Sequence, residues 1–211
     1  MNYKGILFDL DGVLCHTDRY HYQAWKELAD RLGVPFDKMI NQRLRGVSRR
    51  ECLEIILEQY PGTFSEDEKQ KYLTQKNQSY QKLLDNMSPM DLDEEVCTTL
   101  HELRERGLLL AVGSSSKNAK LILEKLGLGN FFDAVSDGNN ITKSKPDPEV
   151  FLKASSYLGL APKDCLVVED AVAGLEAAKA AGMDAAAIAD AAFSPLAAYS
   201  LTCFSDLLQI S

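Results

Sequence analysis

Between Asp93 and Ala189, short apolar runs alternate with amphipathic helical segments, and this alternation constrains the fold more than any other feature. Such a pattern is typical of a parallel α/β sheet. An earlier run, Gly5–Phe8, is almost continuously apolar, as expected of a parallel strand covered on both faces. We predict further strands at 108–112, 132–135, 166–168 and 185–189, separated by helices at 93–106, 119–126, 148–157 and 171–181.

A polar, largely helical block lies between the first strand and this alternating part, from about Thr17 to Met87. It contains no convincing strand, so it is best explained as a second domain placed over the site of the first. Pro89 fits a linker at its end. We therefore predict a Rossmann-like α/β core formed by residues 1–16 and 89–211, with an inserted helical cap domain at residues 17–88.

The composition indicates an ordinary soluble protein, with 211 residues, 45% hydrophobic residues and 26% charged residues. A net charge of −8 argues against nucleic acid as a partner. The five cysteines show no C-x-x-C spacing, which favours a reduced cytoplasmic protein over a disulfide or zinc framework. No apolar run reaches membrane length, and because the first strand begins almost at once we expect no signal peptide.

Two aspartates follow the first strand, in the sequence Asp9-Leu10-Asp11-Gly12. Side chains two residues apart in an extended chain point to the same side, so both carboxylates should face one small volume. Ligands of parallel sheets gather beyond the carboxyl ends of the strands. Because two close carboxylates repel each other without a cation, the pair suggests a magnesium site. The alternative is a solvated turn.

Two further strand ends carry polar residues. The second strand leads into Gly113-Ser114-Ser115-Ser116-Lys117-Asn118 and a helix, where the hydroxyls could be helix caps or part of a phosphate site. After the third strand, Lys145 precedes Pro146, which restrains its backbone toward extended geometry. A fixed cation there could bridge an aspartate and a phosphate, although a surface lysine is the default interpretation.

The fourth core strand ends in Glu169 and Asp170, directly before an alanine-rich helix. Together with the first acid pair they form a set of hard oxygen ligands suited to Mg²⁺. Acids at the start of a helix are also favourable as caps, so each pair taken alone has a structural explanation. The recurrence of polar residues at successive strand ends favours a site.

This order of acid pair, hydroxyl, lysine and acid pair resembles the haloacid dehalogenase (HAD) superfamily of phosphotransferases, with matches at Asp9-x-Asp11, Ser114, Lys145 and Glu169-Asp170. The resemblance implies an HAD-like fold in which Asp9 is the nucleophile that becomes an aspartyl phosphate. It implies that Asp11 is the general acid/base, and that Ser114 and Lys145 hold the phosphoryl oxygens. Mg²⁺ would be bound by Asp9, the backbone carbonyl of Asp11, Glu169 and Asp170.

Three features of the predicted cap bear on the substrate. His21 and Trp25 share an apolar stripe of the helix 19–32, where a histidine is more often a satisfied core residue than a catalytic one. Ser48 begins a capping box that puts Arg49 at the first helical position, which is unfavourable for a cation unless an anion binds there. Lys76, beside Asn77, interrupts an apolar line and either lines a cavity or extends toward solvent.

The cap and the second loop together are similar to the β-phosphoglucomutase family, in the patterns His21-x-x-Ala24-Trp25, Gly46-Val47-Ser48-Arg49, Lys76-Asn77 and Ser114-x-Ser116-Lys117-Asn118. The resemblance implies that Arg49 grips the non-transferring phosphate of the substrate, and that His21 and Lys76 couple cap closure to the acid/base. Thr17 matches the hinge position, although His16 stands where related chains usually carry an acid. The implied substrate-binding residues are His21, Trp25, Gly46, Val47, Ser48, Arg49, Lys76, Asn77, Ser115, Ser116 and Asn118.

By this resemblance we expect a Mg²⁺-dependent mutase that interconverts β-glucose 1-phosphate and glucose 6-phosphate through β-glucose 1,6-bisphosphate. The nearest alternative is a sugar-phosphate phosphatase of the same fold, in which water discharges Asp9; Arg49 favours the mutase. A phosphorylatable receiver-like module is disfavoured by Asp11 and by the large cap. We expect a cytoplasmic monomer that acts on small sugar phosphates.

Overall fold

The computed structural model describes residues 3–44 and 47–210 of the chain. The chain divides into two compact units, one formed by residues 1–16 and 87–211 and the other by residues 17–86. We call the first unit the core and the second the cap, and each is considered by itself below.

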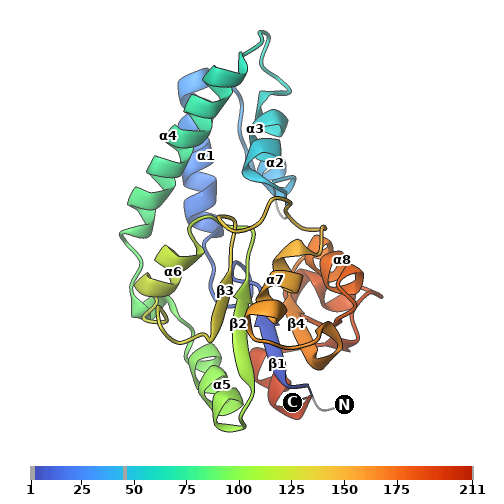
Figure 1. Cartoon of the computed structure of the whole chain (residues 1–211). Coiled ribbons are helices and arrows are strands. Elements are labelled where there is room, and N and C mark those ends of the chain that lie inside the picture. The colour runs from blue at the N-terminus through green and yellow to red at the C-terminus, as the bar shows by residue number, and fades with distance from the viewer. Residues whose placement is uncertain (1–2, 45–46, 211) are drawn as a thin grey trace. The chain divides into compact units, whose positions relative to one another are not determined.

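The core is built on one six-stranded sheet in which every neighbouring pair of strands is parallel (Figure 1). Its order is β3-β2-β1-β4-β5-β6. The predicted α/β parallel-sheet class is therefore confirmed. The sixth strand was not predicted, because it spans only two residues and leaves no readable pattern. The strands are β1 (Gly5–Phe8), β2 (Leu109–Gly113), β3 (Ala134–Ser136), β4 (Cys165–Glu169), β5 (Asp184–Ala187) and β6 (Tyr199–Ser200).

Helices cover both faces of this sheet (Figure 1), which explains why its central strands β2, β1 and β4 are mostly apolar. On one face, Leu7 and Val167 belong to a buried cluster with Phe151 and Leu175 of the covering helices. On the other face, the ring of Phe8 stacks on that of Phe204. The core helices are α5 (Glu94–Glu105) and α6 (Ala119–Lys125) on one side and α7 (Glu149–Tyr157) and α8 (Val172–Ala180) on the other, with short 3-10 turns at Pro89–Asp91, Pro162–Asp164, Ala189–Phe193 and Phe204–Gln209.

The predicted boundaries of these elements differ from the observed ones by one or two residues at most ends, the usual uncertainty of helix and strand termini. Gly107, Gly127 and Gly182, expected just beyond three helices, all adopt positive φ angles. That conformation satisfies the last carbonyls of a helix and is accessible to glycine without a steric penalty.

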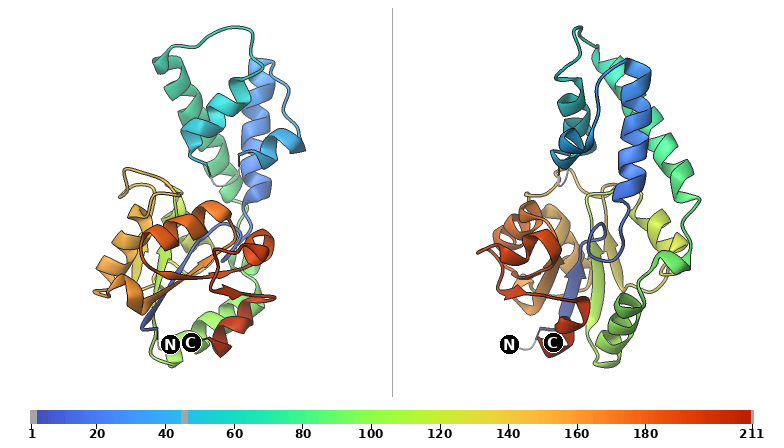
Figure 2. Two further views of the ribbon diagram at one scale, coloured as in Figure 1. Left: turned by 90° about the vertical axis from the view of Figure 1, so that its right-hand side faces the viewer. Right: turned by 180° about the vertical axis from the view of Figure 1, so that it is seen from behind.

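The regular elements of the cap's described residues are all helices, joined by loops: α1 (Asp18–Leu32), α2 (Lys38–Gln42), α3 (Arg49–Leu57) and α4 (Glu66–Leu84). The starts of α3 and α4 are set by capping boxes at Ser48 and Ser65. Helices α1 and α4 lie side by side in all views (Figures 1 and 2). A buried apolar cluster that includes Trp25, Leu28 and Leu53 fills the cap interior.

All five cysteines, which lie within the described part of the chain, are free thiols. Across residues 3–44 and 47–210, no helix combines the length and apolar character that a membrane crossing requires.

Candidate active site

The register of the sheet brings the two predicted acid pairs together. Phe8 pairs with Val168 across the β1–β4 ladder, so the residues that follow, Asp9 and Glu169, are neighbours at the carboxyl edge. The backbone N–H of Asp9 continues the ladder by donating to the carbonyl of Val168 at 3.0 Å. Because Phe8 also pairs with Val112, the Ser114 loop begins at the same edge. Sequence positions more than a hundred residues apart thereby meet.

Lys145 bridges the two acid pairs. Its Nζ donates to Oδ1 of Asp9 at 2.5 Å and also bonds to Oε1 of Glu169. The side chain of Lys145 is 8% exposed and that of Glu169 only 1%. Burial opposes the charge on Lys145, but the carboxylates of Asp9 and Glu169 outweigh it and raise the pKa of the ammonium group. Lys145 is thus a fixed, protonated cation and not a surface lysine.

Glu169 is held from two sides. Its Oε2 accepts the backbone N–H groups of Asp170 and Ala171, both at 3.0 Å, while Oε1 meets Lys145. Burial is the main influence on this carboxyl and raises the pKa of Glu169, against the opposing effect of Lys145. The side chain therefore combines the capping role foreseen from the sequence with a direct place in the acid cluster.

Three carboxylates could hold a metal ion in this cluster. One ligand oxygen from each of Asp9, Glu169 and Asp170 lies within 4.8 Å of the other two. Hard carboxylate oxygens are the ligands that Mg²⁺ prefers, so the donor set fits the predicted ion. The carboxylate of Asp11 is outside this three-residue group. That arrangement is compatible with the expectation that Asp11 offers its backbone carbonyl.

Two glycines make room for these acids. Gly12 has φ +94°, and a Cβ at that position would lie 2.1 Å from Oδ2 of Asp170. A Cβ on Gly174, in the first turn of α8, would lie 1.9 Å from both Cδ and Oε1 of Glu169. Real Cβ atoms do not approach other heavy atoms so closely. The acid cluster therefore depends on the absence of side chains at Gly12 and Gly174.

The loop after β2 is organised by its own hydroxyls. Ser114 is 2% exposed, and its Oγ accepts the backbone N–H of Ser116 at 3.1 Å. Oγ of Ser116 in turn accepts the N–H of Asn118 at 3.2 Å. Each hydroxyl keeps its proton for a further acceptor, such as a phosphoryl oxygen. Oγ of Ser115 is buried and has no hydrogen-bond partner among the residues the structure describes.

The cap contains a second cluster around Lys76, which is only 1% exposed and so does not extend to solvent. Its Nζ lies 2.9 Å from Nδ1 of His21 and within 4.7 Å of the ring centres of Trp25 and Tyr80. The hydroxyl of Tyr80 donates to Oγ1 of Thr17 at 3.0 Å, and its ring stacks on that of His21. The structure thereby brings together predicted residues from both ends of the cap.

His21 is neutral in this arrangement. An ammonium group can only donate, so Nδ1 of His21 must accept from Lys76 and the ring proton resides on Nε2. Burial, then the charges of Lys76 and Arg49, lower the pKa of His21 well below its usual range. The histidine is a hydrogen-bonded partner of Lys76 rather than a plain core residue.

The remaining predicted cap residues occupy the start of α3 and the middle of α4. Ser48 is the N-cap of α3, Arg49 is its first residue and is partly buried, and Val47 is 39% exposed. Asn77 is partly buried on α4, next to Lys76. The predicted residue Gly46 lies outside the described residues.

Three residues with a clear place near these clusters were not predicted as site residues. Tyr80 lies one helical turn after Lys76, and a tyrosine at that spacing from a lysine is a readable signal. Gly174 has a usable signal as well, because glycine inside an alanine-rich helix is unfavourable without a reason. Asp137 is 1% exposed in the loop after β3, and nothing in its local sequence marks it.

Comparison with known proteins places these features in context. The family described as haloacid dehalogenase-like hydrolase matches residues 3–182. The β-phosphoglucomutase of Bacillus subtilis is 40% identical over 188 residues, which cover 88% of this chain and 83% of that protein. The fructose-1-phosphate phosphatase YqaB of Escherichia coli is 33% identical over 183 residues, covering 87% of this chain and 95% of that protein.

Among solved structures, the crystal structure of β-phosphoglucomutase from Clostridium difficile superposes with a TM-score of 0.89 at 33% sequence identity. The match covers 97% of this chain and 93% of that one. The fold and the predicted resemblance are therefore both confirmed, while the names of the relatives include mutases as well as phosphatases.

Proposed function

Because the chain belongs to the haloacid dehalogenase-like hydrolase family, we propose that it is a Mg²⁺-dependent phosphotransferase. Its reaction would be the interconversion of β-glucose 1-phosphate and glucose 6-phosphate through β-glucose 1,6-bisphosphate. The observation that carries the mutase assignment is the position of Arg49, the first residue of α3. A cation there opposes the helix dipole, and a bound phosphate would turn that cost into a gain.

The core supplies phosphoryl transfer. An oxygen of Asp9 attacks phosphorus of the sugar bisphosphate, the bond from phosphorus to the sugar oxygen breaks, and Asp11 gives a proton to that oxygen. When the phosphate at C1 is the one transferred, glucose 6-phosphate leaves and a molecule of β-glucose 1-phosphate binds. In the return step the C6 hydroxyl of this β-glucose 1-phosphate loses its proton to Asp11 and attacks the phosphoryl group on Asp9, which regenerates the bisphosphate. One phosphate has then moved without net consumption of water.

The other core residues stabilise the charge of this transfer. Lys145, already bonded to Asp9 at 2.5 Å, would meet the phosphoryl oxygens together with the hydroxyl of Ser114. Asp9, the carbonyl of Asp11, Glu169 and Asp170 would hold Mg²⁺. When bound, the ion neutralises negative charge that develops on the transferring group.

The cap would hold the part of the substrate that does not react. We assign Arg49 to the distal phosphate, with Ser116 and Asn118 of the core as partners for the same molecule. His21 and Lys76 would link cap closure to Asp11, with Thr17 as the hinge. The tight packing of Lys76 against His21, Trp25 and Tyr80 supports a fixed rather than a mobile cation. A closed cap that excludes water would favour transfer to a sugar over hydrolysis.

The decisive experiment incubates the purified protein with Mg²⁺, β-glucose 1-phosphate and trace β-glucose 1,6-bisphosphate, and follows glucose 6-phosphate and free phosphate together. A mutase forms glucose 6-phosphate with little free phosphate. In Arg49→Ala, isomerisation should fall about ten- to a hundredfold, because a charge-assisted contact is lost. Hydrolysis of acetyl phosphate, which has no second phosphate, should change little.

Arg50→Ala is the matched control, because Arg50 is the next residue of α3 and forms exposed ion pairs with Glu54 and Glu66. Exposed pairs of this kind contribute little, so both reactions should stay near the wild-type rate. Equal losses of both reactions in Arg49→Ala would assign Arg49 to folding or to the core site. If neither reaction fell, the mutase assignment would fail.

A phosphatase acting on a small sugar phosphate is the second candidate. It is favoured by the 33% identity to the fructose-1-phosphate phosphatase YqaB, which covers 95% of that protein. In this case water attacks the phosphoryl group on Asp9, with Asp11 accepting its proton. Stoichiometric release of free phosphate from β-glucose 1-phosphate, without glucose 6-phosphate, would establish it.

A further inference from the structure

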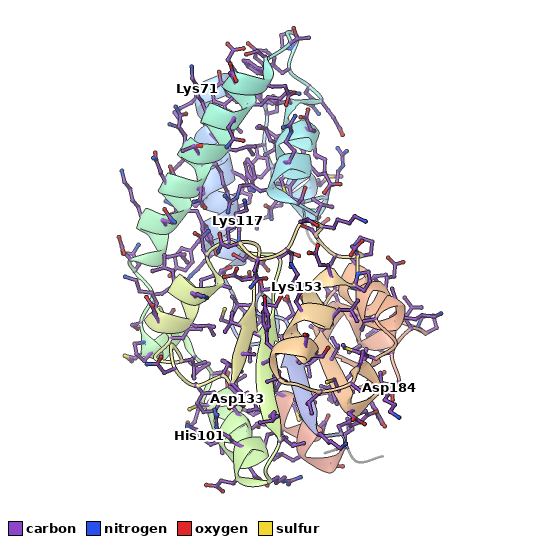
Figure 3. The ribbon with its side chains drawn as sticks, in the orientation of Figure 1. Lys71, His101, Lys117, Asp133, Lys153 and Asp184 are labelled. Carbon is purple, nitrogen blue, oxygen red and sulfur yellow. The ribbon has the colours of Figure 1, made fainter. Side chains whose placement is uncertain are left out.

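The loop that follows β3, residues 137–140, is hydrogen-bonded to the Ser114–Asn118 loop. The N–H of Gly138 donates to the carbonyl of Ser116 at 3.1 Å, and Nδ2 of Asn139 donates to the carbonyl of Lys117 at 2.9 Å. Two consecutive carbonyls of the candidate phosphate loop are therefore held by its neighbour. Figure 3 labels Lys117 of the Ser114–Asn118 loop, at the end of the sheet opposite to Asp133 and Asp184.

Asp137 orients the donor that makes the second of these contacts. Its Oδ1 accepts the backbone N–H of Asn139 at 2.8 Å, and its Oδ2 accepts Nδ2 of the same residue at 3.2 Å. Nδ2 carries two hydrogens, so it can bond to Asp137 and to the carbonyl of Lys117 at once. Asp137 is 1% exposed, whereas Asn139 lies at the surface.

The two loops lie so close together that there is no room for a side chain at Gly138. A Cβ built on Gly138 would lie 2.4 Å from the carbonyl oxygen of Ser115 and 3.0 Å from the nitrogen of Lys117. The backbones of the two loops are thus in direct contact. The N–H of Ser114 adds a further bond by donating to the carbonyl of Ser136 at 3.0 Å.

The hydrogen bonds between the two loops also fix the orientation of the serine hydroxyls. The peptide group between Lys117 and Asn118 is held at both ends, its carbonyl by Asn139 and its N–H by Oγ of Ser116. A planar peptide transmits the orientation of one end to the other. Asn139 therefore acts on Ser116 through one rigid unit, and Ser116 acts on Ser114 through the bond from its N–H to Oγ of Ser114. A preformed loop binds an anion without first having to be ordered.

We propose that Asn139, oriented by Asp137, is a positioning residue that holds the Ser114–Asn118 loop in its phosphate-binding conformation. The inference rests on the proposed function only in taking this loop as the phosphate site. In this proposal Asn139 acts through the backbone of the loop, so its role does not depend on which sugar is bound.

The test uses the full-length protein with Mg²⁺, p-nitrophenyl phosphate as substrate and inorganic phosphate as competitive inhibitor. In Asn139→Ala, both the KM of the substrate and the Ki of phosphate should rise about three- to tenfold, the effect of losing one hydrogen bond. Asn139→Asp should be worse than Asn139→Ala, because it places a carboxylate against Asp137. Asn130→Ala, which removes another exposed asparagine of the core, should leave both constants unchanged.

KM and Ki do not depend on how much of the enzyme is folded, which separates positioning from stability. An Asn139→Ala variant that loses only maximal rate, with KM and Ki unchanged, would overturn the proposal. So would an Asn139→Asp variant that binds phosphate as tightly as the wild type. A wild-type protein that hydrolyses p-nitrophenyl phosphate but does not isomerise β-glucose 1-phosphate would refute the mutase assignment and leave the positioning test intact.

Discussion

The substitution Gly174→Ala tests whether the acid cluster determines the sequence of α8. In an ordinary helix interior this change stabilises a protein by about 0.5–1 kcal/mol, because glycine loses more backbone freedom on folding. Here the new Cβ would lie 1.9 Å from Cδ and Oε1 of Glu169, so the carboxylate has to move. We therefore expect the usual gain to be reversed.

The magnitude follows from what Glu169 would lose. Overpacking a buried site typically costs about 1–3 kcal/mol. Displacing Oε1 also weakens its charge-assisted bond to Lys145, a type of contact worth about 1.5–3 kcal/mol. After subtracting the helix gain, Gly174→Ala should lower the free energy of unfolding by about 1.5–5.5 kcal/mol. Urea denaturation in the presence of a chelator measures this change in unfolding free energy without a contribution from bound metal.

A double-mutant cycle with Glu169→Ala isolates the cause. Once Glu169 is truncated, a methyl group at position 174 has room, and adding Gly174→Ala should stabilise by about 0.5–1 kcal/mol instead. The sign of the effect should thus depend on Glu169. If Gly174→Ala were neutral or stabilising in the wild-type background, the reasoning from the close approach would be wrong.

Three further predictions concern the chemistry of the core. Asp9→Asn should abolish turnover and leave the circular dichroism spectrum unchanged; substantial remaining activity would exclude Asp9 as the nucleophile. Exhaustive chelation should stop activity, and adding Mg²⁺ should restore it without any added zinc. Full activity after chelation would contradict the magnesium site. The bond from Lys153, together with those from the backbone N–H of Lys143 and from the hydroxyl and backbone N–H of Thr142, lowers the pKa of Glu149 to about 2. The contribution of the ionised Glu149 carboxylate to the free energy of unfolding should be complete above about pH 4.5 and disappear as the pH falls toward 2. The difference in unfolding free energy between wild type and Glu149→Gln should therefore vanish over that range. A constant difference down to pH 2 would show that these hydrogen bonds do not stabilise the ionised carboxylate.

The strand-end residues of the core were predictable because residues that follow the strands of a parallel sheet all lie at the same edge of that sheet. Strands β1, β2 and β4 are mostly apolar and end in or directly before polar residues, and the carboxyl ends of these parallel strands lie at one edge. Asp9, Ser114 and Glu169 could therefore be grouped before any coordinates were known. The helix start at Ser48 was equally local, because a capping box lies within four residues.

The partners of these residues depended on packing between distant segments. The sequence indicated a lysine near the acids, but only the tertiary structure joined Lys145 to Asp9 and Glu169 and thereby fixed its charge. It also decided between a solvent-directed and a buried Lys76, because that depended on His21 from another helix.

Asp137 and Asn139 mark the limit of sequence reasoning most clearly, since their local sequence is that of any polar turn. Asn139, which Asp137 orients, contacts the backbone carbonyl of Lys117 in a loop some twenty residues earlier, and backbone atoms leave no trace in side-chain patterns. What the sequence determined by itself was therefore the order of elements and the residue types at the strand ends. The tertiary structure alone decided which groups pair, which are buried and which loops are held in place, because these properties arise between segments that the chain order does not connect.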